Sequence, residues 1–521
     1  MSITLLNAVS ISKPMLKKRL EALKPDKEAV KIQHAKGKLT AEERLALLMD
    51  KGSFVELDIF AEAKSKDAHE SKKPRDGVIT GYGTIESRPA YVFAQDFTYM
   101  GGSMGEVHNR KIARVMELAL KNGCPCVGLY DSGGARIQEG VAALDSGGRI
   151  FKLNMLMSGI VPQFSLILGP CAGIAVYSPA LTDFILMSGK TGSLFITGPD
   201  VLKSATGESI SLEELGGSVV HSEKSGLVHL TAEDEKQCIQ MLKLLLGYLP
   251  QNNLEQPPAH ASGDPITRKN KTIQRIVPQD PKKPYDMKEV IAEVVDKGSF
   301  LEIHAAYAQS AIVGFARFGG KVIGVVANQP SVLAGCLDIH SSDKIARFVR
   351  FCDSFNVPLI TLVDVAGYLP GKEQEQNGVI RHGSKILYAY AEATVPKISL
   401  ILRKAYGGAF IALASKELGH DMVLAWPHAE IAVMGAEQAV AILYRKELQG
   451  KNAERFKKEK IAEYGQKFLN PYHAASSGQV DMVIPPEETR KNLGMALQML
   501  VHKRDSVIKE RKYRKHGNIP L

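Results

Sequence analysis

Four glycine-rich turns carry the residues whose types and spacing could do chemistry. They read Asp131-Ser-Gly-Gly-Ala-Arg136, Gly169-Pro-Cys-Ala-Gly-Ile-Ala175, Asp364-Val-Ala-Gly-Tyr368 and Lys404-Ala-Tyr-Gly-Gly-Ala409. Glycine accepts the backbone angles that point N–H groups into a cleft, and it adds no side chain there. Where such a turn begins a helix, the unpaired N–H groups lie at the positive end of the helix dipole. The turns therefore predict sites for an anion, either a phosphate or the oxyanion of an enolate, although glycines also serve tight packing alone.

A side chain that could act as a general base is harder to find. Four histidines are candidates, and each is more simply explained as a hydrogen-bonded structural residue: His108, His340, His382 and His428. Asp131 and Asp364 stand at expected strand ends, where we expect them to cap the following turns. The lack of an obvious acid–base pair favours chemistry in which the substrate or a cofactor moves the proton.

One motif points to different chemistry. Gly101-Gly-Ser-Met-Gly105 fits the hydrolase pattern G-x-S-x-G, with Ser103 as the nucleophile. In a hydrolase this serine turns directly off the end of a strand, whereas here about seven residues separate it from an expected strand end at Gln95. The second half has Cys336 at the equivalent position. A serine hydrolase or thioesterase stays open as an alternative.

The elements that must position these turns occur twice along the chain. Lys111-Ile-Ala-Arg114 recurs as Lys344-Ile-Ala-Arg347, an offset of 233 residues that also carries Asp131 onto Asp364. An offset of 234 carries Gly173 onto Gly407. Upstream, Asp50-Lys-Gly-Ser-Phe recurs at Asp296. A colinear series of this kind predicts a tandem duplication, and hence two anion sites, one in each half.

Each half has the pattern of an α/β domain. A helix capped at Thr40, with Glu43 completing a capping box, leads into the first half. Short apolar strands then alternate with amphipathic helices: strands at 90–95, 127–130 and 164–168, answered by 322–327, 359–363 and 398–402, and helices at 110–121 and 343–354. Residues 256–284 are rich in proline and polar side chains. We therefore predict domains at 1–255 and 285–521 with a linker between them.

Composition sets the class of protein. The chain has 521 residues, 45% hydrophobic and 23% charged, which is typical of a soluble globular protein with more than one core. We expect no membrane span and no signal peptide, and a cytoplasmic enzyme, or one of the mitochondrial matrix in a eukaryote. The six cysteines form no Cys-x-x-Cys pair, so we predict free thiols and no metal site.

The net charge of +10 is concentrated at one end of the chain. Residues 490–521 contain nine Lys or Arg and two acids, so they supply most of it. Lys509-Glu-Arg-Lys-Tyr-Arg-Lys515 reads as a solvated basic helix or tail, with contacts to acidic partners as the alternative. No nucleic-acid module accompanies it, and we predict no nucleic-acid partner.

Several longer strings resemble the β-subunit carboxyltransferases of biotin-dependent acyl-CoA carboxylases, of the propionyl-CoA carboxylase type. The resemblance runs over about residues 15–515 and includes 131–140, 176–183, 195–200, 213–217, 378–383, 392–397, 403–409, 425–427 and 430–436. It implies a tandem duplication of a crotonase-like (ClpP/crotonase) ββα-spiral domain. It also implies a homo-hexamer whose active sites lie between the first half of one subunit and the second half of another.

The resemblance further implies the reaction and the residues that serve it. Carboxybiotin on a partner protein would give up its carboxyl group, and biotin itself would take the α-proton of the acyl-CoA. Gly173 and Ile174 would hold the thioester enolate oxygen. The biotin oxygen would be held by Gly407, Gly408 and Ala409. Further contacts to substrate would come from Ser132, Gly133, Gly134, Ala135 and Arg136 at the coenzyme A site, and from Tyr406 and Ile411.

Departures from the family pattern concern substrate choice. The family usually has Gly-Gly where this chain has Gly173-Ile174, and the segments 144–148 and 371–377 are also unusual. Propionyl-CoA-specific members resemble one another in having Asp at position 411. Ile411 is instead similar to members that also accept acetyl-CoA and to some decarboxylase subunits. The overall resemblance implies propionyl-CoA as the first expected substrate, and Ile411 adds acetyl-CoA as the second.

Partner proteins follow from what the chain lacks. It has no biotin-attachment motif and no ATP-grasp domain, so we expect a partner, a biotin carboxylase / biotin carboxyl carrier subunit, to supply both functions. No tightly bound cofactor is expected in this chain. Two alternatives stay open: the α-subunit of a biotin-dependent methylmalonyl-CoA decarboxylase, and a non-catalytic carboxylase paralogue.

Overall fold

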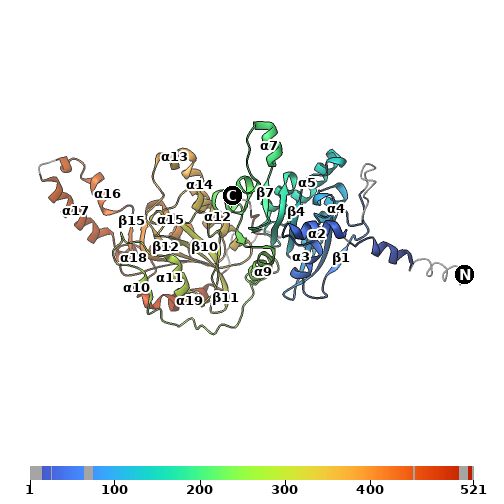
Figure 1. Cartoon of the computed structure of the whole chain (residues 1–521). Coiled ribbons are helices and arrows are strands. Elements are labelled where there is room, and N and C mark those ends of the chain that lie inside the picture. Colours follow the sequence, from blue (N-terminus) through green and yellow to red (C-terminus); the bar gives the residue numbers. More distant parts are fainter. Residues whose placement is uncertain (1–13, 25, 64–73, 450–451, 504–513, 519–521) are drawn as a thin grey trace. The chain divides into compact units, whose positions relative to one another are not determined.

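The computed structural model describes residues 14–24, 26–63, 74–449, 452–503 and 514–518. The chain forms two compact units, the first ending at Gly247 and the second beginning at Tyr248. Figure 1 follows them by colour, from blue to green and from green to red. Most of the predicted basic tail lies outside the described residues.

The first unit is built on one mixed sheet. Its order is β1-β2-β3-β4-β5-β6-β8, with β7 paired to the end of β5. The strands are β1 (Val55–Leu57), β2 (Val78–Ile85), β3 (Arg88–Gln95), β4 (Cys126–Ser132), β5 (Gln163–Ala172), β6 (Phe184–Ser188), β7 (Ser193–Phe195) and β8 (Leu230–Ala232). The hairpin β2–β3 is antiparallel, and β3, β4, β5 and β6 run parallel, so their carboxyl ends share one edge.

The second unit repeats this sheet. Its order is β9-β10-β11-β12-β13-β14-β16, with β15 paired to the end of β13. The strands are β9 (Leu301–Ile303), β10 (Ala311–Phe318), β11 (Lys321–Asn328), β12 (Leu359–Val365), β13 (Lys397–Tyr406), β14 (Met422–Ala425), β15 (Glu430–Ala432) and β16 (Met482–Val483). Even the irregularity recurs, because the register shifts between residues 130 and 132 and again between 363 and 365.

Helices connect the strands in both units. The first has α2 (Lys27–Ala35), α3 (Ala41–Leu48), α4 (Glu106–Asn122), α5 (Val141–Met157), α6 (Tyr177–Leu181), α7 (Pro199–Thr206), α8 (Leu212–Gly216) and α9 (Glu235–Leu246). The second has α10 (Ile273–Ile276), α11 (Met287–Val294), α12 (Ile339–Ser354), α13 (Lys372–Asn377), α14 (Val379–Glu392), α15 (Gly407–Ala414), α16 (Ala436–Leu443), α17 (Ala453–Phe468), α18 (Pro471–Ser476) and α19 (Thr489–Leu500). In Figure 1, α16 and α17 project from their unit as a pair.

Local contacts are repeated as faithfully as the topology. Asp50 accepts hydrogen bonds from the backbone N–H groups of 86–87, at the β2–β3 turn. Asp296 does the same with residues 319–320, at the β10–β11 turn. The expected capping box at Thr40 is present as well. The predicted duplication of an α/β fold is therefore confirmed.

Each unit buries a separate apolar core between its sheet and its helices. In the first, Ile112, Met116 and Ile167 belong to the core cluster. In the second, the cluster contains Trp426, whose indole N–H donates to Thr489 Oγ1 at 2.9 Å. No helix in the part of the chain that the structure describes is long and apolar enough to cross a membrane.

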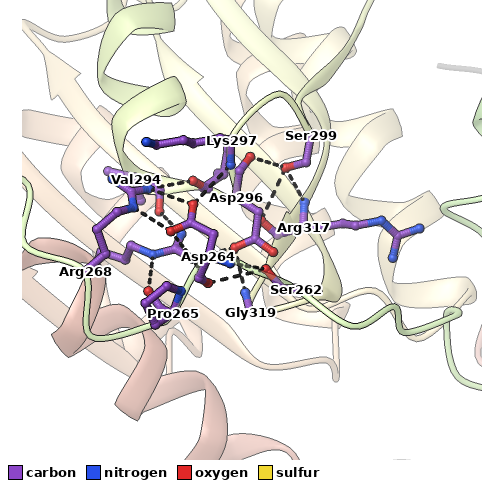
Figure 2. A network of polar contacts seen from close by, with 12 residues as sticks. Ser262, Asp264, Pro265, Arg268, Val294, Asp296, Lys297, Ser299, Arg317 and Gly319 are labelled. Carbon is purple, nitrogen blue, oxygen red and sulfur yellow. Dashed lines mark hydrogen bonds and ion pairs between the residues drawn. The ribbon is translucent and has the colours of Figure 1, made fainter.

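The segment predicted as a linker packs on the second unit. Asp264 accepts a hydrogen bond from Arg268 Nε at 2.6 Å and another from the N–H of Lys297 at 3.2 Å (Figure 2). The buried guanidinium of Arg490 donates to the carbonyl oxygens of Asp264 and Pro265. These contacts fix residues 264–268 next to the β10–β11 hairpin, while the boundaries 1–255 and 285–521 stay a prediction.

The described end of the chain is anchored on the second unit too. His516 Nε2 lies 3.0 Å from Asp353 Oδ2, and Lys515 Nζ donates to the carbonyl oxygen of Asp353. Burial would raise the pKa of Asp353, but the hydrogen bond from His516 and the nearby Lys515 hold it well below its usual range. Part of the basic C-terminal sequence is therefore tied down by a buried carboxylate.

Candidate active site

The two turns predicted to hold oxyanions have nearly identical backbone geometry. β5 ends at Ala172, and Gly173 follows with φ of 56° as the first residue of a short 3₁₀ turn that leads into α6. β13 ends at Tyr406, and Gly407 follows with φ of 57° at the start of α15. Positive φ is easy for glycine alone, so both positions need it. Each strand thus ends in a turn whose next N–H groups lie at a helix N-terminus.

A pocket of about 700 Å³ opens at the second-half turn. Gly407 and Gly408 line it, and so does Tyr406 of β13. Its other walls come from segments 281–282, 366–368 and 433–438, from Lys404 and Glu430, and from Ile461 of α17 and the adjoining Leu469. A volume of this size is that of a small-molecule site.

A titratable pair lies inside this pocket. The hydroxyl of Tyr406 donates a short hydrogen bond to Glu430 of β15, and both residues line the pocket. Burial raises the pKa of the Tyr406 hydroxyl, and the adjacent Glu430 raises it further. Tyr406 is therefore a neutral donor at neutral pH. Sequence reasoning missed Glu430 as a site residue, although it begins one of the strings that match the family.

In the first half, the loop 132–136 lies next to the turn at Gly173. Ser132 Oγ donates to the carbonyl oxygen of Gly102 at 2.7 Å and accepts the N–H of Gly134 at 3.2 Å. A Cβ at Gly134 would lie 2.8 Å from the carbonyl oxygen of Ala172, the residue before Gly173. The structure therefore brings this part of the predicted coenzyme A loop next to the predicted oxyanion turn.

Within that loop Gly133 is exposed and Ala135 is half-buried, whereas Arg136 is buried. The Arg136 guanidinium donates to Asp76 and Glu139 and to the carbonyl oxygen of Ser103. Burial lowers its pKa, but the two carboxylates outweigh that effect and raise it. This geometry suits a residue that shapes the loop better than one that contacts substrate.

Ile174 packs against the neighbouring helix. Its Cδ1 lies where a Cβ on Gly147 of α5 would be only 2.5 Å away, so the glycine makes room for the isoleucine. Ile174 also packs on the apolar core of the first unit. Two departures from the family pattern therefore compensate for each other: the larger side chain of Ile174 fits because Gly147, within 144–148, has none.

In the second half, the space beside the turn is filled by a side chain from the neighbouring loop. Gly408 has no side chain, and the ring of Tyr368 lies 3.6 Å from where its Cβ would be. The same ring lies over Gly383 of α14, 2.7 Å from its would-be Cβ. Tyr368 is the repeat counterpart of Ala135, so the bulky side chain comes from the loop in one half and from the turn in the other.

The remaining predicted contact residues of the second half lie on α15. Ala409 is buried in its first turn. Ile411 is two residues further along the same helix and is 48% exposed. The two residues therefore differ in how accessible they are to a ligand.

The expectation that Asp131 and Asp364 cap their turns is wrong. Asp131 is buried and accepts hydrogen bonds from Lys38 Nζ at 2.6 Å and Arg44 Nη1 at 2.9 Å. Asp364 accepts from Arg403 Nε at 2.8 Å. Both carboxylates stabilise buried cations because a charge of either sign is costly inside a protein without a partner.

None of the histidines among the described residues lines the pocket at Gly407. His108 is fully buried between the Gln95 side chain and the carbonyl oxygen of Asp76. Burial, together with the nearby positive charge of Arg136, lowers its pKa to about 3. His108 is thus a neutral structural residue.

The hydrolase alternative receives no support from the geometry. Ser103 follows a short 3₁₀ turn, and its Oγ accepts a hydrogen bond from Arg136 Nε at 3.4 Å. Its repeat counterpart Cys336 is buried and is a free thiol, as are the other five cysteines. Burial raises the pKa of the Cys336 thiol.

Comparison with known proteins identifies the family. Residues 32–519 match the carboxyl transferase domain family. The chain belongs to this family. A carboxyl transferase relative, the methylmalonyl-CoA decarboxylase subunit alpha of Veillonella parvula, is 53% identical over 94% of this chain and 95% of its own length. The propionyl-CoA carboxylase beta chain of Saccharopolyspora erythraea is also 53% identical, over 95% of this chain and 92% of its own length.

A solved carboxyl transferase shares the whole fold. The crystal structure of transcarboxylase 12S, described as a hexamer with methylmalonyl-CoA and methylmalonic acid bound, matches with a TM-score of 0.93 and 48% identity. The match covers 98% of both chains. The predictions of a duplicated crotonase-like fold and of a carboxyltransferase enzyme of the biotin-dependent type are therefore confirmed.

Proposed function

We propose that this carboxyl transferase moves a carboxyl group between carboxybiotin and the α-carbon of a short-chain acyl-CoA. The observation that carries the proposal is the pair of matched turns at Gly173 and Gly407, one in each half. A carboxyl transfer through two enolates has two oxyanions to stabilise. Backbone N–H groups that are held in place before the reaction do this without reorganisation.

The assignment of the two turns follows the family resemblance. In the first half, Gly173 and Ile174 hold the thioester enolate oxygen, with the loop 132–136 beside them for coenzyme A. In the second half, Gly407, Gly408 and Ala409 hold the ureido oxygen of biotin. The pocket at Gly407 suits a small neutral ring, because it combines backbone N–H groups with apolar walls such as Val433 and Met434.

The proton balance agrees with the residues of the pocket. Carboxybiotin supplies the carboxyl group as cosubstrate, and its ring nitrogen accepts the proton that leaves the acyl α-carbon. This chain therefore needs no base of its own. Its groups orient the two substrates and stabilise charge. The hydroxyl of Tyr406 donates its one proton to Glu430, so its oxygen is an acceptor of fixed position in the pocket.

The partners and the assembly belong to the same proposal. Separate biotin carboxylase and biotin carboxyl carrier subunits would load the cosubstrate, and the chain would work as a homo-hexamer, the assembly named for transcarboxylase 12S. Location in the cytoplasm, or in the mitochondrial matrix of a eukaryote, stays a prediction from sequence.

Reconstitution with the carboxylase and carrier subunits tests the function. We expect carboxylation of propionyl-CoA in preference to acetyl-CoA. Ile411→Asp should shift the preference further towards propionyl-CoA, because it introduces the residue found in members specific for that substrate. Ile174→Gly should change the rate, because it alters the turn proposed to hold the thioester enolate oxygen. Rates and acyl preferences that stay the same in both variants would contradict the site assignment.

The reverse direction is the second candidate, and one observation favours it. A relative of equal identity is named as a methylmalonyl-CoA decarboxylase subunit. A gene for an integral-membrane subunit beside this one would favour decarboxylation, and a biotin carboxylase gene would favour carboxylation. Normal activity with purified partners in either direction would exclude a non-catalytic paralogue.

A further inference from the structure

The second-half pocket has a wall that comes from outside the predicted catalytic domain. Pro281 and Lys282 line the pocket together with α16, and Lys282 Nζ lies 3.4 Å from Glu437 on that helix. Both wall residues belong to 256–284, the segment predicted as a linker. Because a linker has no fixed position of its own, contacts with the second unit must hold these wall residues in place.

A buried arginine, Arg403, holds this wall. Arg403 on β13 is 3% exposed, and its Nη1 donates to the carbonyl oxygens of Asp280 at 3.0 Å and Lys283 at 2.8 Å, with a longer contact to that of Pro278. A planar guanidinium can make several such bonds at once in a fixed geometry, which a lysine ammonium on a flexible stem cannot copy.

Asp364 and Tyr285 orient the Arg403 guanidinium. Its Nε donates to Asp364 Oδ2 at 2.8 Å, and its guanidinium lies 4.7 Å from the centre of the Tyr285 ring. The other oxygen of Asp364 accepts the N–H of Lys404 at 3.2 Å, two residues before Tyr406 ends the strand. Asp364 and Arg403 thus connect the end of β13, the turn at Gly407 and the 278–283 segment.

The first half folds without this device. The repeat counterpart of Arg403 is Gly169, where a Cβ would lie 2.1 Å from Asp131 Oδ1. There the cations Lys38 and Arg44 come from the lead-in segment and reach the strand. In the second half the cation is on the strand and reaches back to the lead-in segment. The fold does not require the second arrangement, which points to a purpose specific to the second-half pocket.

We propose that Arg403 is a positioning residue for the biotin-side ligand: it fixes residues 278–283 as a wall of the pocket at Gly407 and so sets how tightly that ligand is held. This role rests on the proposed function, because that function names the ligand. Arg403 itself contacts backbone carbonyl oxygens and Asp364.

The test compares two buried arginines that anchor the same segment. Arg403→Lys removes the bonds to the pocket wall. Arg490→Lys is the matched control, since Arg490 is 0% exposed and donates to the carbonyl oxygens of Asp264 and Pro265, which do not line the pocket. Both variants are assayed in the full-length chain for carboxyl transfer from methylmalonyl-CoA to free biotin.

The two Michaelis constants separate positioning from general loosening. Arg403→Lys should raise KM for biotin by about tenfold or more, since small misplacements at a site are costly, and leave KM for methylmalonyl-CoA within about twofold. Arg490→Lys should lower the melting temperature and leave both constants within about twofold of wild type. An unchanged KM for biotin in Arg403→Lys, or equal increases in both constants, would overturn the role.

A second variant covers the case in which Arg403→Lys does not fold. Pro281→Gly loosens the wall itself without touching the buried pair, and it should raise KM for biotin selectively. If it does not, the wall does not hold the ligand and the proposal fails. A wild-type chain that transfers no carboxyl group to biotin would instead overturn the proposed function, and this role with it.

Discussion

His108 is a residue whose type suggests catalysis and whose surroundings exclude it. It is fully buried on α4, one nitrogen lies 3.0 Å from the carbonyl oxygen of Asp76, and the other lies 3.3 Å from the Gln95 amide nitrogen. A charged imidazolium here would lie near Arg136, so both burial and repulsion keep it neutral. The pKa of about 3 is far from that of a base active at neutral pH.

This burial predicts acid sensitivity of the fold. In the unfolded chain His108 takes up a proton below its ordinary pKa of 6.5, but in the folded chain only near 3. The unfolded state therefore binds more protons between these values, and stability falls as pH decreases through this window, by ~2 kcal/mol at pH 5 relative to pH 8. Urea unfolding at the two pH values, in wild type and His108→Gln, measures the effect.

The histidine replacement should flatten the pH dependence, since glutamine does not titrate. His34→Gln is the control, because His34 is an exposed histidine on the same unit and lies 2.9 Å from Glu43 at the surface. An equally steep fall of stability in wild type and His108→Gln would show that other groups cause the acid loss.

At the scale of elements, the site consists of two strand–turn–helix units that are alike in backbone and different in side chains. The φ angles at Gly173 and Gly407 differ by one degree. The space beside each turn is filled by Ile174 in one half and by Tyr368 in the other. The helix that passes each turn accordingly has a glycine at the point of contact.

This packing predicts strong coupling between Gly147 and Ile174. Gly147→Ala should force the Ile174 side chain to move, which costs about 1–3 kcal/mol as overpacking and disturbs the N–H groups of the turn. In the Ile174→Gly background the same change should be neutral or stabilising by up to about 1 kcal/mol, because alanine is the better helix former. Urea midpoints of the four proteins measure the coupling.

Gly148→Ala is the matched control for this cycle. Gly148 is the next residue of α5, and a Cβ there would meet no atom within 4 Å. It should be neutral or stabilising in both backgrounds. The same cost for Gly147→Ala with and without Ile174 would mean that the two residues do not meet in solution.

At the scale of the whole molecule, two copies of one topology support different surroundings for the same carboxylate. Asp131 is held by Lys38, which lies between α2 and α3, and by Arg44 of α3, whereas Asp364 is held by Arg403 of the neighbouring strand. In the second half the cation is on the strand, and residues 278–283 of the lead-in segment form a pocket wall. A duplicated fold can in this way give two sites of the same backbone chemistry and different shape.

The proposed assembly makes a prediction at this scale. If the chain forms a homo-hexamer, its mass in solution should be six times the 56.7 kDa of one chain. Light scattering coupled to size exclusion measures this mass, and the hexamer fraction should carry the activity. Full carboxyl transfer by a monomeric fraction would contradict a site shared between subunits.

The sequence by itself determined the fold class, the repeat and the glycine turns. These are local or colinear properties: alternating apolar strands at 90–95 and 322–327, a capping box at Thr40, and glycines where the backbone needs positive φ. Such signals depend on neighbouring residues, so they can be read along the chain. The predicted strands are a few residues shorter than those observed, because strand ends are fixed by pairing.

Only the tertiary structure decided which side chains meet. The contacts of Asp131 with Lys38 and of Arg403 with residues 278–283 join segments about a hundred residues apart, and no local pattern encodes them. The same holds for Ile174 over Gly147. Packing between distant segments decides whether a charge has a partner and whether a histidine is buried. It also decides whether residues 278–283 line a pocket, so these features depend on the folded chain.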